Sequence, residues 1–264
     1  MMAWLWRLLI ALDMILLSSP AQATWSLIVL DTRTHQIGIA GASCSDFVAG
    51  IEGYSPGKGA VVAQAMSNIA AKGKALELLN QGRSPQEIVA LITDVAFDQD
   101  AAKRQYAVAS FDFDRIAAFT GSDSPDYHGV IAGRNFSVQG NTLTGAQVLE
   151  ASAFVLSHEN ERANFSLADT LMRALEAGAV AGGDKRCGRQ HATSAFITVV
   201  KPDMDWWDPY LHLHVHHVPP GSKNAVELLR VLYTRWDKHH SHDRSVSWSI
   251  SPSPVERDTS HVER

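Results

Sequence analysis

Thr24 is the residue with the clearest chemical potential in the sequence. It directly follows Ala21-Gln22-Ala23, the small-x-small pattern that signal peptidase accepts. Cleavage there would leave threonine as the first residue of the mature chain. Its hydroxyl oxygen could attack a carbonyl, and its α-amino group, with a free pKa of about 7.7–8.0, could accept the hydroxyl proton. The alternative is that Thr24 is only a residue tolerated after a cleavage site.

Residues 1–23 have the features of a signal peptide. Arg7 precedes a mostly apolar run from Leu8 to Leu17, which Asp13 interrupts and which is too short to span a bilayer. A Ser-Ser-Pro sequence then breaks the helix. We therefore expect a secreted or periplasmic protein with no membrane contact after cleavage, and an uncleaved N-terminal anchor is the alternative.

Asn141 and Asp184 could complete a site around such a nucleophile. Asn141 follows Gly140 at the end of a predicted strand, where its amide could donate to an oxyanion, although a turn asparagine beside glycine is commoner. Asp184 follows two glycines and could orient the α-amino group of Thr24 or bind substrate. The alternative for Asp184 is that it caps the turn after the preceding helix.

Polar side chains near these positions are candidates for substrate binding. The arginines of the glycine-rich loop 182–190 could hold a carboxylate with two hydrogen bonds, or could simply be solvated surface residues. Ser67 and Asn68, which follow the strand predicted at 60–65, could line the same pocket, or could cap the next helix. The candidate set is Ser67, Asn68, Gln139, Arg186, Arg189 and Gln190.

Three histidines, His212, His214 and His216, alternate along one predicted strand and therefore share one face of it. Histidines in this pattern could bind zinc or copper. No Cys, Asp or Glu lies at ligand spacing, and a solvated outer face is the alternative. We treat them as weak metal candidates and predict no metal and no cofactor.

Composition narrows the classes of partner. The net charge of −5 gives no basic field, so nucleic acid is not an expected partner.

Two cysteines, Cys44 and Cys187, indicate one disulfide if the protein is exported, with two buried free thiols as the alternative. The sequence leaves a homo-oligomer open.

The elements that must position these residues alternate between groups of strands and groups of helices. This segregation predicts an α+β domain with antiparallel sheets over residues 24–237, followed by a disordered polar tail at 238–264. A capping box is predicted at Ser84, with an apolar stripe of Ile88, Leu91, Ile92 and Val95 behind it. The predicted strands are 24–30, 37–44, 60–65, 105–111, 115–120, 135–140, 195–200 and 210–218, and further helices are expected at 70–80, around 148–156, after Ser166 and at 223–236.

Four sequence blocks carry a resemblance to a known family. They are TWSLIVLDTRTHQIGIAGAS, GAVVAQAMSN, FSVQGNTL and GGDKRCGRQ, in this order. The chain resembles domain of unknown function 1028 over roughly residues 24–236. The resemblance implies a four-layer αββα sandwich of N-terminal-nucleophile hydrolase type. Members usually expose Thr or Ser by losing Met, and their loop reads Gly-Gly-Asp-x-Arg-Gly, so Cys187 is a departure that could pair with Cys44 and tie the loop to the central sheet.

The leading hypothesis is therefore an exported amidohydrolase that uses Thr24 on a small-molecule or peptide substrate. A non-catalytic module that binds a cell-wall or peptide ligand on the same fold is the alternative. A histidine-based metal binder is a third interpretation.

Overall fold

The computed structural model describes residues 24–113, 115–125, 127–159 and 166–239, together with the backbone of residues 246–250. The predicted signal peptide lies outside the described residues. None of the described helices is long and apolar enough to cross a membrane.

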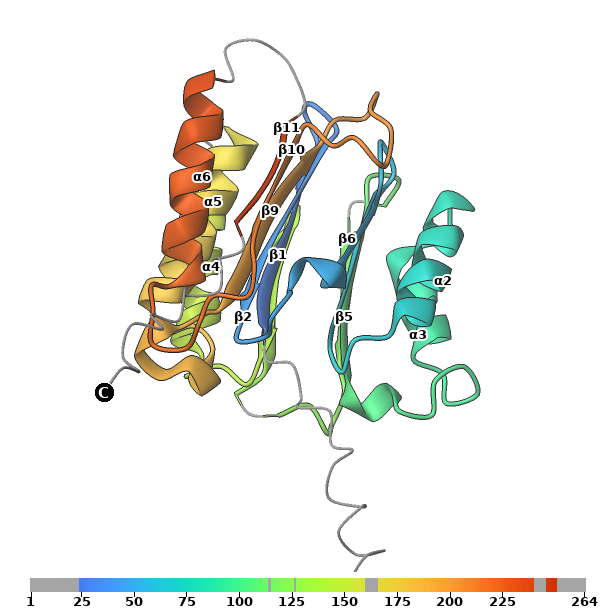
Figure 1. Cartoon of the computed structure of the whole chain (residues 1–264). Coiled ribbons are helices and arrows are strands. Elements are labelled where there is room, and N and C mark those ends of the chain that lie inside the picture. The colour runs from blue at the N-terminus through green and yellow to red at the C-terminus, as the bar shows by residue number, and fades with distance from the viewer. Residues whose placement is uncertain (1–23, 114, 126, 160–165, 240–245, 251–264) are drawn as a thin grey trace, which may run out of the picture.

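Two β-sheets pack face to face, and helices cover the outer face of each (Figure 1). The larger sheet has seven strands in the order β11-β10-β9-β2-β1-β8-β7, and the smaller has four in the order β3-β4-β5-β6. The larger sheet contains β1 (Thr24–Asp31), β2 (Gln36–Ser43), β7 (Gly129–Ala132), β8 (Phe136–Asn141), β9 (Ser194–Val200), β10 (Leu211–Val215) and β11 (Val246–Ile250). The smaller sheet contains β3 (Glu52–Ser55), β4 (Gly59–Ala65), β5 (Arg104–Ser110) and β6 (Arg115–Thr120).

In the described part of the chain, α-helices form the outer layers. The seven-stranded sheet is covered by α4 (Gln147–Glu159), α5 (Leu167–Val180) and α6 (Ala225–His239). The four-stranded sheet is covered by α2 (Ile69–Asn80) and α3 (Pro85–Ile92). Short 3-10 turns lie at η1 (Ala49–Ile51), η2 (Ala101–Lys103) and η3 (Lys185–Gln190). The result is a helix–sheet–sheet–helix arrangement.

Successive side chains of β1 point to opposite faces of the sheet. Both faces are buried, because helices cover one face and the second sheet covers the other. Trp25, Leu27 and Val29 pack into the core shared with α4, α5 and α6. Ile28 and Leu30 belong to the core between the two sheets. On that inner face the Leu30 end of the strand is apolar, whereas the Thr24 end carries polar side chains.

For helix α3, the predicted cap is confirmed and the predicted apolar stripe is wrong in part. The capping box is confirmed, because the Ser84 hydroxyl accepts from the Glu87 amide at 3.3 Å while the Glu87 carboxylate accepts from the Ser84 amide at 2.9 Å. The stripe is confirmed at Ile88 and Ile92, which are buried, and is wrong at Leu91, which is 47% exposed. Helix α3 ends at Ile92, so Val95 is 71% exposed and lies outside the helix.

Three strands differ from the sequence expectation. β3 and β7 each have four residues and lie at sheet edges, where short strands leave little periodic signal. β11 forms within the segment expected to be a disordered tail. It pairs with β10 in parallel, because α6 crosses over between them, whereas the other pairings of the described strands are antiparallel. The expectation of purely antiparallel sheets is therefore corrected at this one pairing.

Candidate functional site

Thr24 opens β1 at the polar end of the layer between the sheets. It pairs with Ser43 of β2 on one side and with Asn141 of β8 on the other. Residues directly opposite each other in a ladder project from the same face, so these three side chains share the inner face. All three are buried, and Thr24 is 1% exposed in the full chain.

A chain of buried amides lies beneath Thr24. Gln64 of β4 donates to the Thr24 carbonyl oxygen at 3.5 Å and to the Gln105 side-chain oxygen at 2.7 Å. The Asn141 amide also donates to that Gln105 oxygen, at 3.2 Å. Gln105 in turn donates to Thr120 Oγ1 and to the carbonyl oxygens of Gly129 and Gly140. Gln105 is thus the hub that fixes the orientation of Asn141.

Gln139, predicted to bind substrate, lies deeper in the same network. Its amide nitrogen donates to Ser26 Oγ at 2.7 Å, and its oxygen accepts from Ser137 Oγ at 2.7 Å. Ser26 closes the network by donating to the Gln64 oxygen at 2.6 Å. The register places Gln139 opposite Ser26, two residues inward from Thr24. This position suits Gln139 to supporting the site rather than to contacting a ligand.

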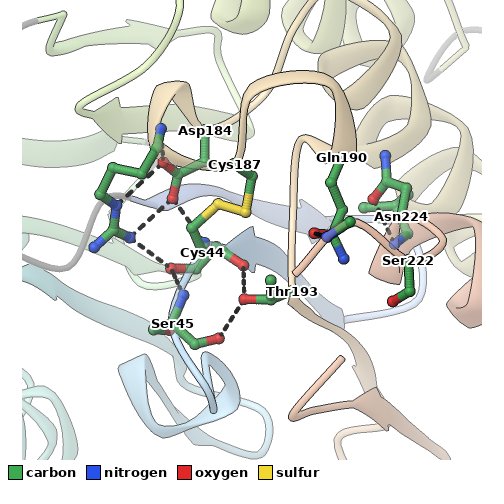
Figure 2. Close-up of a disulfide and its surroundings, with 12 residues drawn as sticks. Cys44, Ser45, Asp184, Cys187, Gln190, Thr193, Ser222 and Asn224 are labelled. Carbon is green, nitrogen blue, oxygen red and sulfur yellow. Dashed lines mark hydrogen bonds and ion pairs between the residues drawn. A yellow bond between two sulfur atoms is a disulfide. The ribbon is translucent and has the colours of Figure 1, made fainter. Parts of the chain in front are cut away.

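Asp184 organises the rim of the site (Figure 2). Its fully buried carboxylate accepts from the Cys44 amide at 2.7 Å and from the Arg186 amide at 2.9 Å. The Arg186 guanidinium donates to both carboxylate oxygens, at 3.2 and 2.9 Å, and reaches Ser43 Oγ at 3.5 Å. Since Ser43 pairs with Thr24, the predicted Asp184 and Arg186 meet one strand away from Thr24.

The predicted disulfide between Cys44 and Cys187 is present, with a Cα–Cα distance of 5.8 Å (Figure 2). It joins the end of β2 to the loop that carries Asp184 and Arg186. A bond of this kind is typical of proteins from oxidising compartments.

Gln190, Asn68 and Ser67, three other predicted binding residues, make hydrogen bonds within the structure. Gln190 donates to the carbonyl oxygens of Pro219 and Lys223, and it accepts from the Gly221 amide, so its side chain organises a neighbouring loop. Asn68 caps α2 and donates to Asp98 at 2.8 Å. The exposed Ser67 donates to the carbonyl oxygen of Ala63, and Arg189 is also exposed.

Three of the five described non-glycine residues with positive φ angles adjoin the candidate site, and the other two, His35 and His217, do not. Ala65, Thr142 and His191 have positive φ angles of 65°, 52° and 67°, which non-glycine residues seldom adopt. Ala65 follows Gln64, and Thr142 follows Asn141. The His191 carbonyl accepts from the Asp184 amide. Strain of this kind often accumulates at functional sites, where the surrounding structure holds it in place.

The histidines of β10 lie elsewhere. The rings of His212 and His214 stack with centroids 5.2 Å apart, and His216 continues the stack at 5.5 Å. His212 Nε2 lies 3.5 Å from Glu52 Oε1 of β3. Burial lowers the pKa of His214 to about 4 and raises that of Glu52 to about 8. Among the described residues, no three or more His, Cys, Asp or Glu side chains are arranged to hold a metal ion.

The sequence interpretation missed Ser43, Gln64 and Gln105. Each is a polar residue in a fully or almost fully buried strand, and each is at most 1% exposed. A buried glutamine needs partners for its amide, so a glutamine at an inward position of such a strand is a signal that could have marked the network.

Comparisons with known proteins identify the family of the chain. The family model described as a family of unknown function, DUF1028, matches residues 24–223, so the match begins at Thr24. The chain is similar to the crystal structure of protein SPO2555 from Silicibacter pomeroyi, of the same family, at 26% identity and a TM-score of 0.68, covering 81% of this chain and 89% of that one. Anbu from Hyphomicrobium sp. strain MC1 is more distant, at 10% identity and a TM-score of 0.35, covering 83% and 95%. No curated protein matches the chain. This chain belongs to the DUF1028 family, as its four sequence blocks predict.

Proposed function

We propose that the protein is an exported amidohydrolase of N-terminal-nucleophile type, in which cleavage before Thr24 releases the nucleophile. The observation that carries the proposal is the position of Thr24. It begins a central strand at the polar end of the layer between two sheets, flanked by Ser43 and Asn141. The family match that begins at Thr24 supports the proposal.

The reaction would proceed by acyl transfer. Thr24 Oγ attacks the carbonyl carbon of an amide, and the hydroxyl proton passes to the α-amino group. The C–N bond breaks, the leaving amine takes that proton, and an ester to Thr24 remains. Water, deprotonated by the same amino group, then attacks the ester. This step releases the carboxylic acid and restores the hydroxyl.

The neighbouring groups have roles consistent with this chemistry. The amide of Asn141 lies beside Thr24 and could donate to the oxyanion, with Gln105 fixing its orientation at 3.2 Å. Asp184 would act as a positioning residue, because it holds Arg186 against Ser43. Desolvation of the α-amino group in this layer would disfavour its charged form, which is the form that cannot act as a base.

The export assignment follows from two features. The Cys44–Cys187 disulfide fits an oxidising compartment outside the cytoplasm. The sequence pattern of residues 1–23 fits a signal peptide. We therefore propose secretion or release into the periplasm. A small molecule or a peptide would be the substrate.

Labelling with a β-lactone probe tests the proposal without knowledge of the substrate. Opening of the strained ring by Thr24 Oγ adds the whole mass of the probe to the chain as an ester. We expect one adduct, located by mass spectrometry on the peptide that begins at Thr24. Thr24→Ala should remove the adduct, and Thr32→Ala, at an exposed threonine in the next turn, should keep it.

Two results would overturn the proposal. One is a mature chain that begins at a residue other than Thr24. The other is labelling that persists in Thr24→Ala. A chain that begins at Thr24 and takes no probe, while retaining the fold, would favour the non-catalytic binding module.

A further inference from the structure

A loop joins β9 to β10 between Val200 and Leu211 (Figure 1). Two exposed tryptophans lie in this loop. Trp206 is 66% exposed and Trp207 is 64% exposed. Their rings are nearly perpendicular, with centroids 5.6 Å apart and an interplanar angle of 88°. Two large aromatic rings at right angles form an open corner with two π faces, which isolated exposed apolar residues do not provide.

The loop is held in shape at its base and by turns. Lys201 Nζ lies 3.7 Å from the ring centroid of Tyr210, which clamps the two ends of the loop together. The Met204 amide donates to the Lys201 carbonyl at 3.3 Å, and the Asp208 amide donates to the Asp205 carbonyl at 3.1 Å. The corner is therefore preorganised, which lowers the entropy lost when a ligand binds.

Beyond Lys201 at its base, the described loop carries charge of one sign only. Between Pro202 and Pro209 it carries three exposed aspartates and no lysine or arginine. The described residues offer none of these aspartates an ion-pair partner. The aspartates are Asp203, Asp205 and Asp208.

We propose that this corner binds the cationic side chain of a lysine- or arginine-containing peptide. Trp is the aromatic residue that attracts cations most strongly over its ring face. The aspartates would complement the positive charge around the corner. The two features select the same ligand chemistry, because aromatic faces and carboxylates both favour an ammonium or guanidinium group.

The negative charge of the three aspartates disfavours other occupants of this corner. A symmetric contact between two copies of this loop would bring six carboxylates together, which is repulsive. An anionic membrane surface would repel the same three aspartates. A cationic peptide is the occupant that gains from both the rings and the carboxylates.

The corner is distinct from the candidate active site. The register pairs Val200 with Ile37 at one end of β2, whereas Ser194 pairs with Ser43 at the other end, beside Thr24. Six residues of strand therefore separate the two ends, or roughly 20 Å at about 3.3 Å per residue. The inference stands independently of the proposed hydrolase activity.

Binding of a fluorescent pentalysine peptide to the purified protein, followed by anisotropy, tests the inference. We expect saturable binding that weakens with added salt. Replacing both tryptophans, Trp206→Ala with Trp207→Ala, should weaken binding about tenfold, since each exposed cation–π contact contributes a factor of about 2 to 5. Replacing the three aspartates by asparagine should weaken it further. Phe154→Ala, which removes an exposed ring from α4, is the matched control and should leave binding unchanged.

The outcomes separate the alternatives. Absence of pentalysine binding would overturn the inference. Binding that depends on the aspartates alone would overturn the role of the tryptophans. Tighter binding of a neutral glucose pentamer would assign the corner to carbohydrate, and self-association lost in the tryptophan variant would assign it to a second copy. Thermal unfolding of each variant should match that of the parent protein, because every substituted residue is exposed.

Discussion

Replacing Cys44 and Cys187 by serine removes the covalent link between the end of β2 and the loop that carries Asp184 and Arg186. The two cysteines are separated by 143 residues, so the disulfide closes a large loop in the unfolded chain. In the chain-entropy model that closure reduces the unfolded-state entropy by about 17 cal/mol/K for a separation of 143 residues, or about 5 kcal/mol at 25 °C.

The measured loss should lie between about 3 and 5 kcal/mol, because real disulfides often give less than the entropy model predicts. The native loop should persist without the bond. The Asp184 carboxylate still accepts from the Cys44 amide at 2.7 Å, and the Lys185 amide still donates to the Thr142 carbonyl. The variant should therefore fold, with lower stability and faster amide exchange between Asp184 and Gln190.

Urea unfolding, followed by circular dichroism without reductant, measures the change. The midpoint should fall while the slope stays nearly constant. The parent protein with reductant should approach the variant. Ser222→Ala, whose hydroxyl donates at 2.6 Å within an exposed neighbouring loop, is the control and should change stability by about 0.5 kcal/mol or less. A loss under about 1 kcal/mol would refute the view that this bond restrains the unfolded chain.

Three further substitutions test the fold and its electrostatics. Gln105→Leu should lower stability by about 3 kcal/mol in thermal unfolding, because the buried amides of Gln64 and Asn141 lose their acceptor. A loss below about 1 kcal/mol would show that water replaces that acceptor. Gly59→Ala should prevent folding or lower stability by about 3 kcal/mol or more. The reason is that φ of Gly59 is +157° and a Cβ there would lie 2.0 Å from the Ala109 carbonyl oxygen. A normal melting temperature would contradict that geometry. Desolvation raises the pKa of Glu52 from 4.5 to about 8, so the folded state binds this proton more tightly than the unfolded state. The free energy of unfolding should thus fall as pH rises from 4.5 to 8, by up to about 1.4 kcal/mol per pH unit, and Glu52→Gln should remove that slope. An unchanged slope in Glu52→Gln would assign the pH dependence to other groups.

Local patterns in the sequence predicted the parts of the fold that depend on local physics. The β-forming residues of 24–30 predicted the central strand, which the structure has as β1 (Thr24–Asp31). The Ser84 capping box depends on residues three apart, so it is visible without any tertiary contact. The pairing of Cys44 with Cys187 followed from there being only two cysteines.

The missed features depend on contacts between distant segments. Gln64 and Gln105 lie directly opposite each other because β4 pairs with β5. They reach Thr24 and Asn141 only because this sheet packs against the sheet that contains β1 and β8, and no local pattern reports that packing. Gln190 looked like a ligand-binding residue because its loop is rich in charge and glycine. Its amide nitrogen donates to the carbonyl oxygens of Pro219 and Lys223, which lie about 30 residues away along the chain.

The central position of β1 constrains the order of events during biogenesis. A signal peptidase cuts an extended segment that is not paired with other strands. In the folded protein Thr24 is hydrogen-bonded into a ladder with β8, whose residues are synthesised more than a hundred positions later. Under the proposed cleavage before Thr24, the cut has to precede the docking of β8. In that scheme a chain that folded too early would bury an unprocessed threonine, so the rate of β8 pairing would set the time window for maturation.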